Sequence, residues 1–285
     1  MSIRGYNCGM FRPFDLIFLQ SRFSLWWGGL RRKQAMVHGH AVTYWEGGCG
    51  ETVLLIHGLN GSTLADFRRL SVALARSHHV ISLDLPGFGL STHVPIQQSV
   101  SNQAGFVRDF MEVLCLERAH VIGNSMGGWV ALQLARRHPG MVHRLVLTAP
   151  AGIRFEHPPL EVFTPEDEEG LRRLLRHICY DPPRLPGWFL RDWLRVVQTR
   201  RGAVKEMLAS MLTEEDLLDA HLSSMRLPTL ILCGDSDRLI PPDTSRRMAV
   251  MMPGARLKMI ERCGHLLLHE HHSMVLRHVE DFLKE

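Results

Sequence analysis

The sequence lacks the features that mark several classes of protein. None of its six cysteines belongs to a C-x-x-C pair, so no disulfide framework is indicated, and Cys115 and Cys233, in apolar segments, are expected to be buried free thiols. A net charge of only +4, with no basic run interleaved with aromatic residues, argues against nucleic acid as a partner. The chain has no internal repeat or low-complexity tract, so we expect one globular fold with a large core.

The sequence also lacks a purely apolar run of the roughly 20 residues that a membrane-spanning helix needs. The most apolar stretch, 14–30, contains Asp15 and Arg22 and is followed by three cations, whereas a signal peptide carries its charge before the apolar part. Drawn as a helix, this stretch has a stripe formed by Leu16, Leu19, Phe23, Trp26, Trp27 and Leu30. The pattern predicts that residues 1–35 form an amphipathic segment that contacts a membrane surface through residues 14–33.

Two alternatives remain for this segment: a helix packed on the protein itself, and a cleaved or spanning segment. The scattered cysteines are typical of a reducing compartment. The expected location is therefore cytoplasmic, or peripheral on the inner face of the membrane.

Strand-like apolar runs alternate with helical patterns along most of the chain. Strands are expected at 36–37, 41–45, 53–56, 80–84, 119–122, 144–148, 229–233 and 257–260, and helices near 63–76, 99–114, 126–137, 243–251 and 271–283. This alternation predicts an α/β fold with a mainly parallel central sheet flanked by helices.

The alternation stops between residues 153 and 227, where apolar residues recur at helical spacing and prolines divide the segment into short pieces. Thr164 is the expected N-cap of one helix, with Pro165 at its first position. We interpret 153–227 as a helical cap, inserted after the sixth strand of a core formed by residues 36–152 and 228–285. Its apolar side chains suit an acyl chain (Trp188, Phe189, Trp193, Met207, Met211). The alternative is a structural insertion without a role in substrate binding.

The pentapeptide Gly123-Asn124-Ser125-Met126-Gly127 lies between a buried strand and a helix and has the pattern G-x-S-x-G. Glycines on both sides permit a sharp turn, which leaves the Ser125 hydroxyl exposed at the apex. A serine nucleophile needs a base and a group that orients the base. The ends of two later strands supply candidates: His265 as the base, and Asp235 or Asp237 as the acid. The backbone N–H groups of Leu59 and Met126 are the expected oxyanion donors.

These motifs together resemble the α/β-hydrolase superfamily, and within it the capped monoacylglycerol lipase and esterase group. The matching residues are His57-Gly58, Asp84 to Ser91, Gly123 to Gly128, Gly234 with Asp237 and Pro241, and Gly264-His265. The resemblance selects Asp237 as the acid, because the family places it three residues after the glycine. It assigns His57 to the oxyanion loop and gives Asp84 no chemical role.

The expected activity is that of a serine carboxylic ester hydrolase, an esterase or lipase that cleaves a monoacylglycerol or similar fatty-acid ester through an acyl-enzyme on Ser125. No cofactor and no metal are expected; His269 and His272 could share a helical face, but no set with zinc spacing stands out. One alternative is a carbon–carbon hydrolase of the meta-cleavage-product type, although Leu266 replaces the tryptophan that usually follows the histidine there. The other is a non-catalytic ligand-binding member of the fold.

Overall fold

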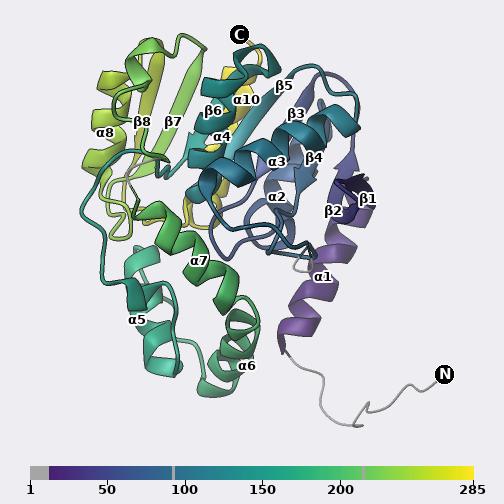
Figure 1. Cartoon of the computed structure of the whole chain (residues 1–285). Coiled ribbons are helices and arrows are strands. Elements are labelled where there is room, and N and C mark those ends of the chain that lie inside the picture. Colours follow the sequence, from purple (N-terminus) through teal and green to yellow (C-terminus); the bar gives the residue numbers. More distant parts are fainter. Residues whose placement is uncertain (1–12, 92–93, 214–215) are drawn as a thin grey trace, which may run out of the picture.

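The computed structural model describes residues 13–91, 94–213 and 216–285, and it has an eight-stranded sheet at its centre (Figure 1). The strands are β1 (Arg31–Val37), β2 (His40–Gly47), β3 (Thr52–Ile56), β4 (His79–Leu83), β5 (Ala119–Asn124), β6 (Val142–Thr148), β7 (Thr229–Gly234) and β8 (Ala255–Ile260). Their order is β1-β2-β4-β3-β5-β6-β7-β8. Strands β3 to β8 are parallel, while β1 and β2 are antiparallel additions at one edge. The predicted mainly parallel sheet is confirmed.

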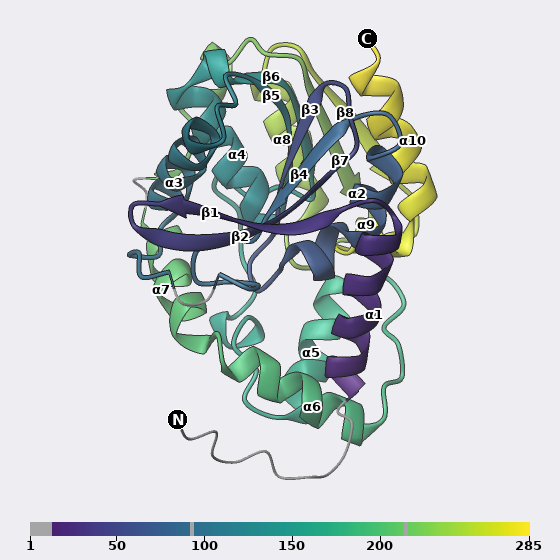
Figure 2. The ribbon, with the colours of Figure 1, turned by 90° about the vertical axis from the view of Figure 1, so that its right-hand side faces the viewer.

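Helices cover both faces of the sheet (Figure 2). They are α1 (Pro13–Trp27), α2 (Arg68–Leu74), α3 (Val100–Val113), α4 (Met126–Arg137), α5 (Glu168–Ile178), α6 (Gly187–Gln198), α7 (Arg201–Met211), α8 (Pro242–Met251), α9 (Leu267–Glu270) and α10 (His272–Leu283), with one-turn helices at Thr63–Phe67, Pro139–Met141, Leu160–Val162 and Leu222–Ser224. One buried cluster joins the sheet to α3, α4 and α8, and a second joins its other face to α1, α2 and α10. The sheet is therefore buried on both sides, as parallel sheets require.

The segment that the sequence predicts as a cap contains α5, α6 and α7, which gather at one end of the sheet (Figure 1). The predicted N-cap of its first helix is wrong: α5 begins at Glu168, and the Asp167 side chain accepts a hydrogen bond from the N–H of Gly170. Asp is an N-cap residue as good as Thr, and here its carboxylate reaches a free donor of the first turn. The Thr164-Pro165 pair lies before the helix instead.

Five of the six cysteines lie in the described residues, and Cys8 lies outside that part of the chain. Two of the five are exposed and three are buried. Cys179, Cys233 and Cys263 are buried and free, and burial raises the pKa of the Cys179 and Cys233 thiols to about 11, which keeps them protonated. The expectation for Cys115 is wrong, because it is exposed in a left-handed turn after α3, with a φ of 54°.

Helix α1 has one face on the protein and one face outward. Leu25 and Leu30 are fully buried against the second cluster, so Leu30 does not belong to the exposed stripe. The other stripe residues are exposed: Leu16, Leu19, Phe23, Trp26 and Trp27. Arg31 already belongs to β1, so the three cations lie on an edge strand rather than on the helix. Within the described residues, no helix has the length and apolar content needed to cross a membrane.

Candidate active site

Ser125 occupies a strained turn between β5 and α4. Its φ of 55° and ψ of −116° are left-handed values that side-chain-bearing residues rarely adopt, and its N–H donates to the carbonyl of Thr148 at 2.8 Å. A Cβ atom on Gly123 would lie 2.4 Å from the carbonyl oxygen of Gly127, and one on Gly127 would lie 2.1 Å from that of Ile56. Both glycines are therefore needed for this turn, as the sequence predicts.

Asp237 and His265 form a buried pair beside this turn. The Nδ1 atom of His265 lies 2.8 Å from Oδ2 of Asp237, while Oδ1 accepts from the N–H groups of Leu239 and Ile240, each at 2.9 Å. These bonds hold the carboxylate in one orientation. Asp235 is exposed and its carboxylate contacts Ser236 and the N–H of Cys263 instead. The geometry therefore pairs His265 with Asp237, the acid that the resemblance selects.

The charge of Asp237 controls the protonation of His265. Burial disfavours the imidazolium, but the negative charge and hydrogen bond of Asp237 outweigh it, so the pKa of His265 is raised above its ordinary value of 6.5. A donor N–H on Nδ1 toward Asp237 leaves Nε2 as the atom free to accept a proton.

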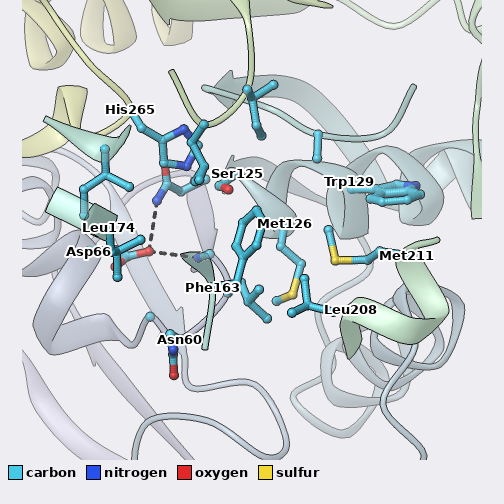
Figure 3. Close-up of a pocket in the computed structure, with 18 of the residues that line it drawn as sticks. Asn60, Asp66, Ser125, Met126, Trp129, Phe163, Leu174, Leu208, Met211 and His265 are labelled. Carbon is cyan, nitrogen blue, oxygen red and sulfur yellow. Dashed lines mark hydrogen bonds between the residues drawn. The ribbon is translucent and has the colours of Figure 1, made fainter. Parts of the chain in front are cut away.

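Ser125 and His265 line the same pocket, with the imidazole ring beside the serine in Figure 3. Among the described residues, no hydrogen bond joins the Ser125 hydroxyl to His265. Such bonds are often long or poorly aligned until substrate binds. The sequence-predicted groups are thus brought together on loops that follow β5, β7 and β8, at the carboxyl ends of parallel strands.

The oxyanion loop follows β3 and lies against the serine turn. Leu59 and Met126 both line the pocket, and neither backbone N–H has an acceptor within the described residues. The Asp66 carboxylate accepts from the N–H of Gly58 at 2.8 Å and from Nδ2 of Asn124 at 3.0 Å (Figure 3). It therefore ties the oxyanion loop to the residue before Ser125.

Arg200, which directly precedes α7, also contacts this loop. Its Nη1 donates to the carbonyls of Asn60 and Gly61 at 3.1 and 3.4 Å. Burial lowers the pKa of Arg200, and the charges of Asp84 and Asp66 counteract this. Arg200 thus carries a half-buried positive charge that connects the predicted cap to the predicted oxyanion loop.

A cavity of about 560 Å³ opens in front of Ser125 and extends beneath the predicted cap. Apolar side chains from α4, the Leu160–Val162 region and α5 to α7 form most of its walls (Trp129, Phe163, Leu174, Val197, Leu208). Phe18 of α1 also lines it. Of the side chains predicted to receive an acyl chain, Trp193 and Met211 line the cavity. Met207 is buried in the main core and Trp188 is exposed, and neither of these nor Phe189 lines the cavity.

Two other motif residues hold the loops in place. Asp84 accepts from the N–H groups of Thr63 and Leu90, each at 2.8 Å, and His57 accepts from the N–H of Leu85 at 3.0 Å through Nε2. Neither lines the cavity in front of Ser125. This placement agrees with the expectation that Asp84 has no chemical role.

Sequence reasoning missed Asp66, Arg200 and Phe18. All three lie in helices or at helix ends. For Asp66, the one available signal was its position a few residues after the predicted oxyanion loop, in an otherwise apolar turn. Arg200 and Phe18 reach the site through tertiary contacts between distant segments, for which the sequence pattern offers no signal.

Comparison with known proteins identifies the architecture. Residues 53–277 match the model of the "Alpha/beta hydrolase family". The 2-hydroxy-6-oxo-2,4-heptadienoate hydrolase of Pseudomonas putida is 31% identical over 254 residues, which cover 83% of this chain and 90% of the relative. Further curated relatives from Comamonas, Cupriavidus and Burkholderia are hydrolases of similar 2-hydroxy-6-oxo acids.

The solved structures that resemble the chain over most of its length include carbon–carbon hydrolases and lipid hydrolases. The meta-cleavage product hydrolase CumD of Pseudomonas fluorescens has a TM-score of 0.72 at 28% identity, covering 88% of this chain and 97% of that one. A membrane phospholipase A described as a bacterial virulence factor has a TM-score of 0.83 at 27% identity, covering 95% of this chain and 91% of that one. A candidate lipase from Acinetobacter baumannii has a TM-score of 0.83 at 26% identity, covering 98% of each chain. With the family model matching more than half of its residues, the chain belongs to the alpha/beta hydrolase family and is a hydrolase.

Proposed function

We propose that Ser125 is the nucleophile of this hydrolase, with His265 as its base and Asp237 as the group that orients the base. His265 accepts the hydroxyl proton through Nε2 as Ser125 attacks the substrate carbonyl, and Asp237 stabilises the imidazolium that forms. The N–H groups of Leu59 and Met126 hold the oxyanion of the tetrahedral intermediate. His265 then protonates the leaving group, and a water molecule releases the acyl group from Ser125.

Two chemistries are compatible with these roles, because both begin at a carbonyl carbon and pass through an oxyanion. The first is hydrolysis of a carboxylic ester, and the second is hydrolysis of a carbon–carbon bond beside a ketone. The curated relatives favour the second chemistry over the ester hydrolysis that the motifs first indicated. Among the solved structures, the phospholipase and the lipase support the first, and the meta-cleavage product hydrolase CumD supports the second.

The site itself favours ester hydrolysis. The observation that carries this assignment is the large, mainly apolar cavity in front of Ser125, which suits the acyl chain of a lipid-like ester. Leu266, after His265, stands where the carbon–carbon hydrolases usually have a tryptophan. We therefore place hydrolysis of an apolar carboxylic ester first, and hydrolysis of a dienoate carbon–carbon bond second, on the strength of the curated relatives.

A direct comparison of substrates distinguishes the two activities. The full chain is assayed with p-nitrophenyl esters of increasing acyl length, with monoacylglycerols, and with 2-hydroxy-6-oxo-2,4-heptadienoate, and Ser125→Ala provides the background rate. The ester assignment predicts a higher kcat/KM for medium or long acyl esters than for the dienoate. A higher kcat/KM for the dienoate would make the second chemistry the function.

A lipid surface is the second partner that we propose, through the outward face of α1. Phe23, Trp26 and Trp27 are exposed and contact one another, with ring centroids 5.8 to 6.4 Å apart. Exposed Arg31 and Arg32 follow, and charges of this sign attract anionic headgroups. Because the same helix contributes Phe18 to the cavity wall, docking would bring the cavity close to lipid substrates.

A further inference from the structure

A cluster of histidines and one carboxylate lies at the end of the sheet opposite Ser125. Glu51 directly precedes β3, His120 is the second residue of β5, and His143 is the second residue of β6. These three strands are neighbours in the sheet. Ser125 directly follows β5 and lies five residues beyond His120, which corresponds to about 16 Å of extended backbone. The cluster is therefore separate from the candidate active site.

An irregularity in the sheet brings two of these side chains together. Ala119 pairs with Val142 and Val121 pairs with Leu145, so His143 and its neighbour on β6 both lie opposite His120. A bulge of this kind redirects a side chain that regular pairing would place elsewhere. The His143 ring consequently lies 4.7 Å from the His120 ring, at an interplanar angle of 23°.

The central histidine of the cluster has an unsatisfied ring nitrogen. His120 is 1% exposed, and its Nε2 lies 3.1 Å from Oε2 of Glu51. Its Nδ1 atom is buried and has no hydrogen-bond partner among the described residues. A buried polar atom without a partner costs free energy, which a bound ion or water molecule at this position would offset.

We propose that Glu51, His120 and His143 form a binding site for a divalent transition-metal ion of the zinc type. One ligand atom from each residue lies within 4.8 Å of the others. Tetrahedral zinc with bonds of about 2.0–2.2 Å needs ligand atoms roughly 3.3–3.6 Å apart. The side chains of exposed Glu51 and half-buried His143 can rotate to bring the ligand atoms from within 4.8 Å to the spacing that zinc needs, whereas His120 is held by the core.

An ion in this position would connect β3, β5 and β6 at their amino ends. It would bind the folded chain and not the unfolded one, and it would raise thermal stability without taking part in the hydrolytic reaction. The fourth position of a three-ligand zinc site is open to water.

The test uses the full chain after treatment with EDTA and dialysis. Zinc chloride is added while binding is followed by titration calorimetry and stability by thermal unfolding. We expect one saturable site and a higher Tm. Glu51→Gln and His143→Ala should each weaken binding by at least about tenfold, since even residues behind the ligands contribute that much. His221→Ala, an exposed histidine elsewhere, is the matched control and should bind as the parent chain does.

Two further measurements test the folding of the variants and the identity of the ligands. The rate of ester hydrolysis without zinc should be the same in Glu51→Gln, His143→Ala and the parent chain, which shows that the variants fold. X-ray absorption at the zinc edge should then show two imidazole ligands. Equal zinc affinity in the parent chain and both variants, no rise in Tm with zinc, or a spectrum without imidazole ligands would each overturn the proposal.

Discussion

At the residue scale, the left-handed turn places Ser125 at the cavity, where the proposed attack on the substrate would begin. Ser125→Ala should therefore fold normally and lose nearly all hydrolysis, by a factor on the order of a million in kcat. Circular dichroism tests whether the variant folds, and the rate with the best ester substrate tests the loss of hydrolysis. Covalent labelling of the parent chain by a fluorophosphonate should map to Ser125. Labelling at a different serine would contradict the assignment.

The pairing of Asp237 with His265 predicts a shift in the pH profile. His265 acts as a base only when neutral, and its pKa lies above the ordinary value of 6.5, so kcat/KM should fall as the pH drops through that raised pKa. Asp237→Asn removes the charge that raises the pKa, which moves this acid limb to lower pH. It should also lower kcat by roughly ten-thousandfold, because the amide favours the wrong tautomer.

Asp235→Asn is the matched control for this measurement, since Asp235 is exposed and two residues away. It should keep both the rate and the position of the acid limb near those of the parent chain. A larger loss in Asp235→Asn than in Asp237→Asn would show that the acid is assigned to the wrong residue.

At the scale of elements, Arg200 joins the start of α7 to the predicted oxyanion loop, and we expect it to act as a positioning residue. A hydrogen bond that involves a charged group contributes roughly 1.5–3 kcal/mol. Arg200→Met should therefore lower kcat by about tenfold or more, with a smaller change in KM, because the loop loses its fixed donor geometry. Arg200→Lys should restore part of the rate. If KM rises while kcat is unchanged, Arg200 binds substrate and does not position the loop.

Replacing exposed aromatic residues on α1 should lower the affinity for lipid without unfolding the protein. Removal of the helix is a poor test, because Leu25 of α1 is fully buried. The double variant Phe23→Ser with Trp27→Ser changes exposed side chains only, and each aromatic ring inserted into lipid contributes up to about 1.5–3 kcal/mol. Sedimentation with vesicles of phosphatidylglycerol should fall sharply, and hydrolysis of a short ester should not.

The control for α1 is Val250→Ser, which changes an exposed apolar residue on α8. It should bind vesicles like the parent chain. Unchanged sedimentation of the α1 double variant would show that this helix is not the contact.

The elements were predictable where a local pattern determines them. The strands from 53 onward and α4 follow from apolar periodicity and from glycines that only a tight turn requires. The N-cap of α5 was wrong because Thr164 and Asp167 are both good capping residues, and only the three-dimensional path of the chain selects one. Cys115 was misplaced because apolar neighbours do not reveal that a helix ends in a left-handed turn.

At the scale of the whole molecule, sequence order could identify the catalytic candidates but not the residues that support them. Ser125, Asp237 and His265 each follow a predicted strand, so the topology of a parallel sheet brings them to one edge. Arg200 and the Glu51 cluster depend on contacts between distant segments, and His143 on a bulge that periodicity does not predict. Ester hydrolases and carbon–carbon hydrolases share these motifs, so the motifs alone could not decide which of the two reactions to place first.

The placement of the two outer strands bears on how copies of this chain behave in concentrated solution. An unpaired strand edge can template aggregation, and charged side chains on it oppose this. Exposed Arg32 and Lys33 lie on β1, and exposed Arg256 and Lys258 lie on β8. Lys33 pairs with Glu46 and Arg256 with Glu285, so Arg32 and Lys258 supply the positive charge of the two outer strands. Two copies that approach edge to edge would repel one another. Arg32→Val with Lys258→Val should therefore increase light scattering on mild heating. High salt screens the repulsion in the parent chain as well, so it should narrow the difference between the variant and the parent chain.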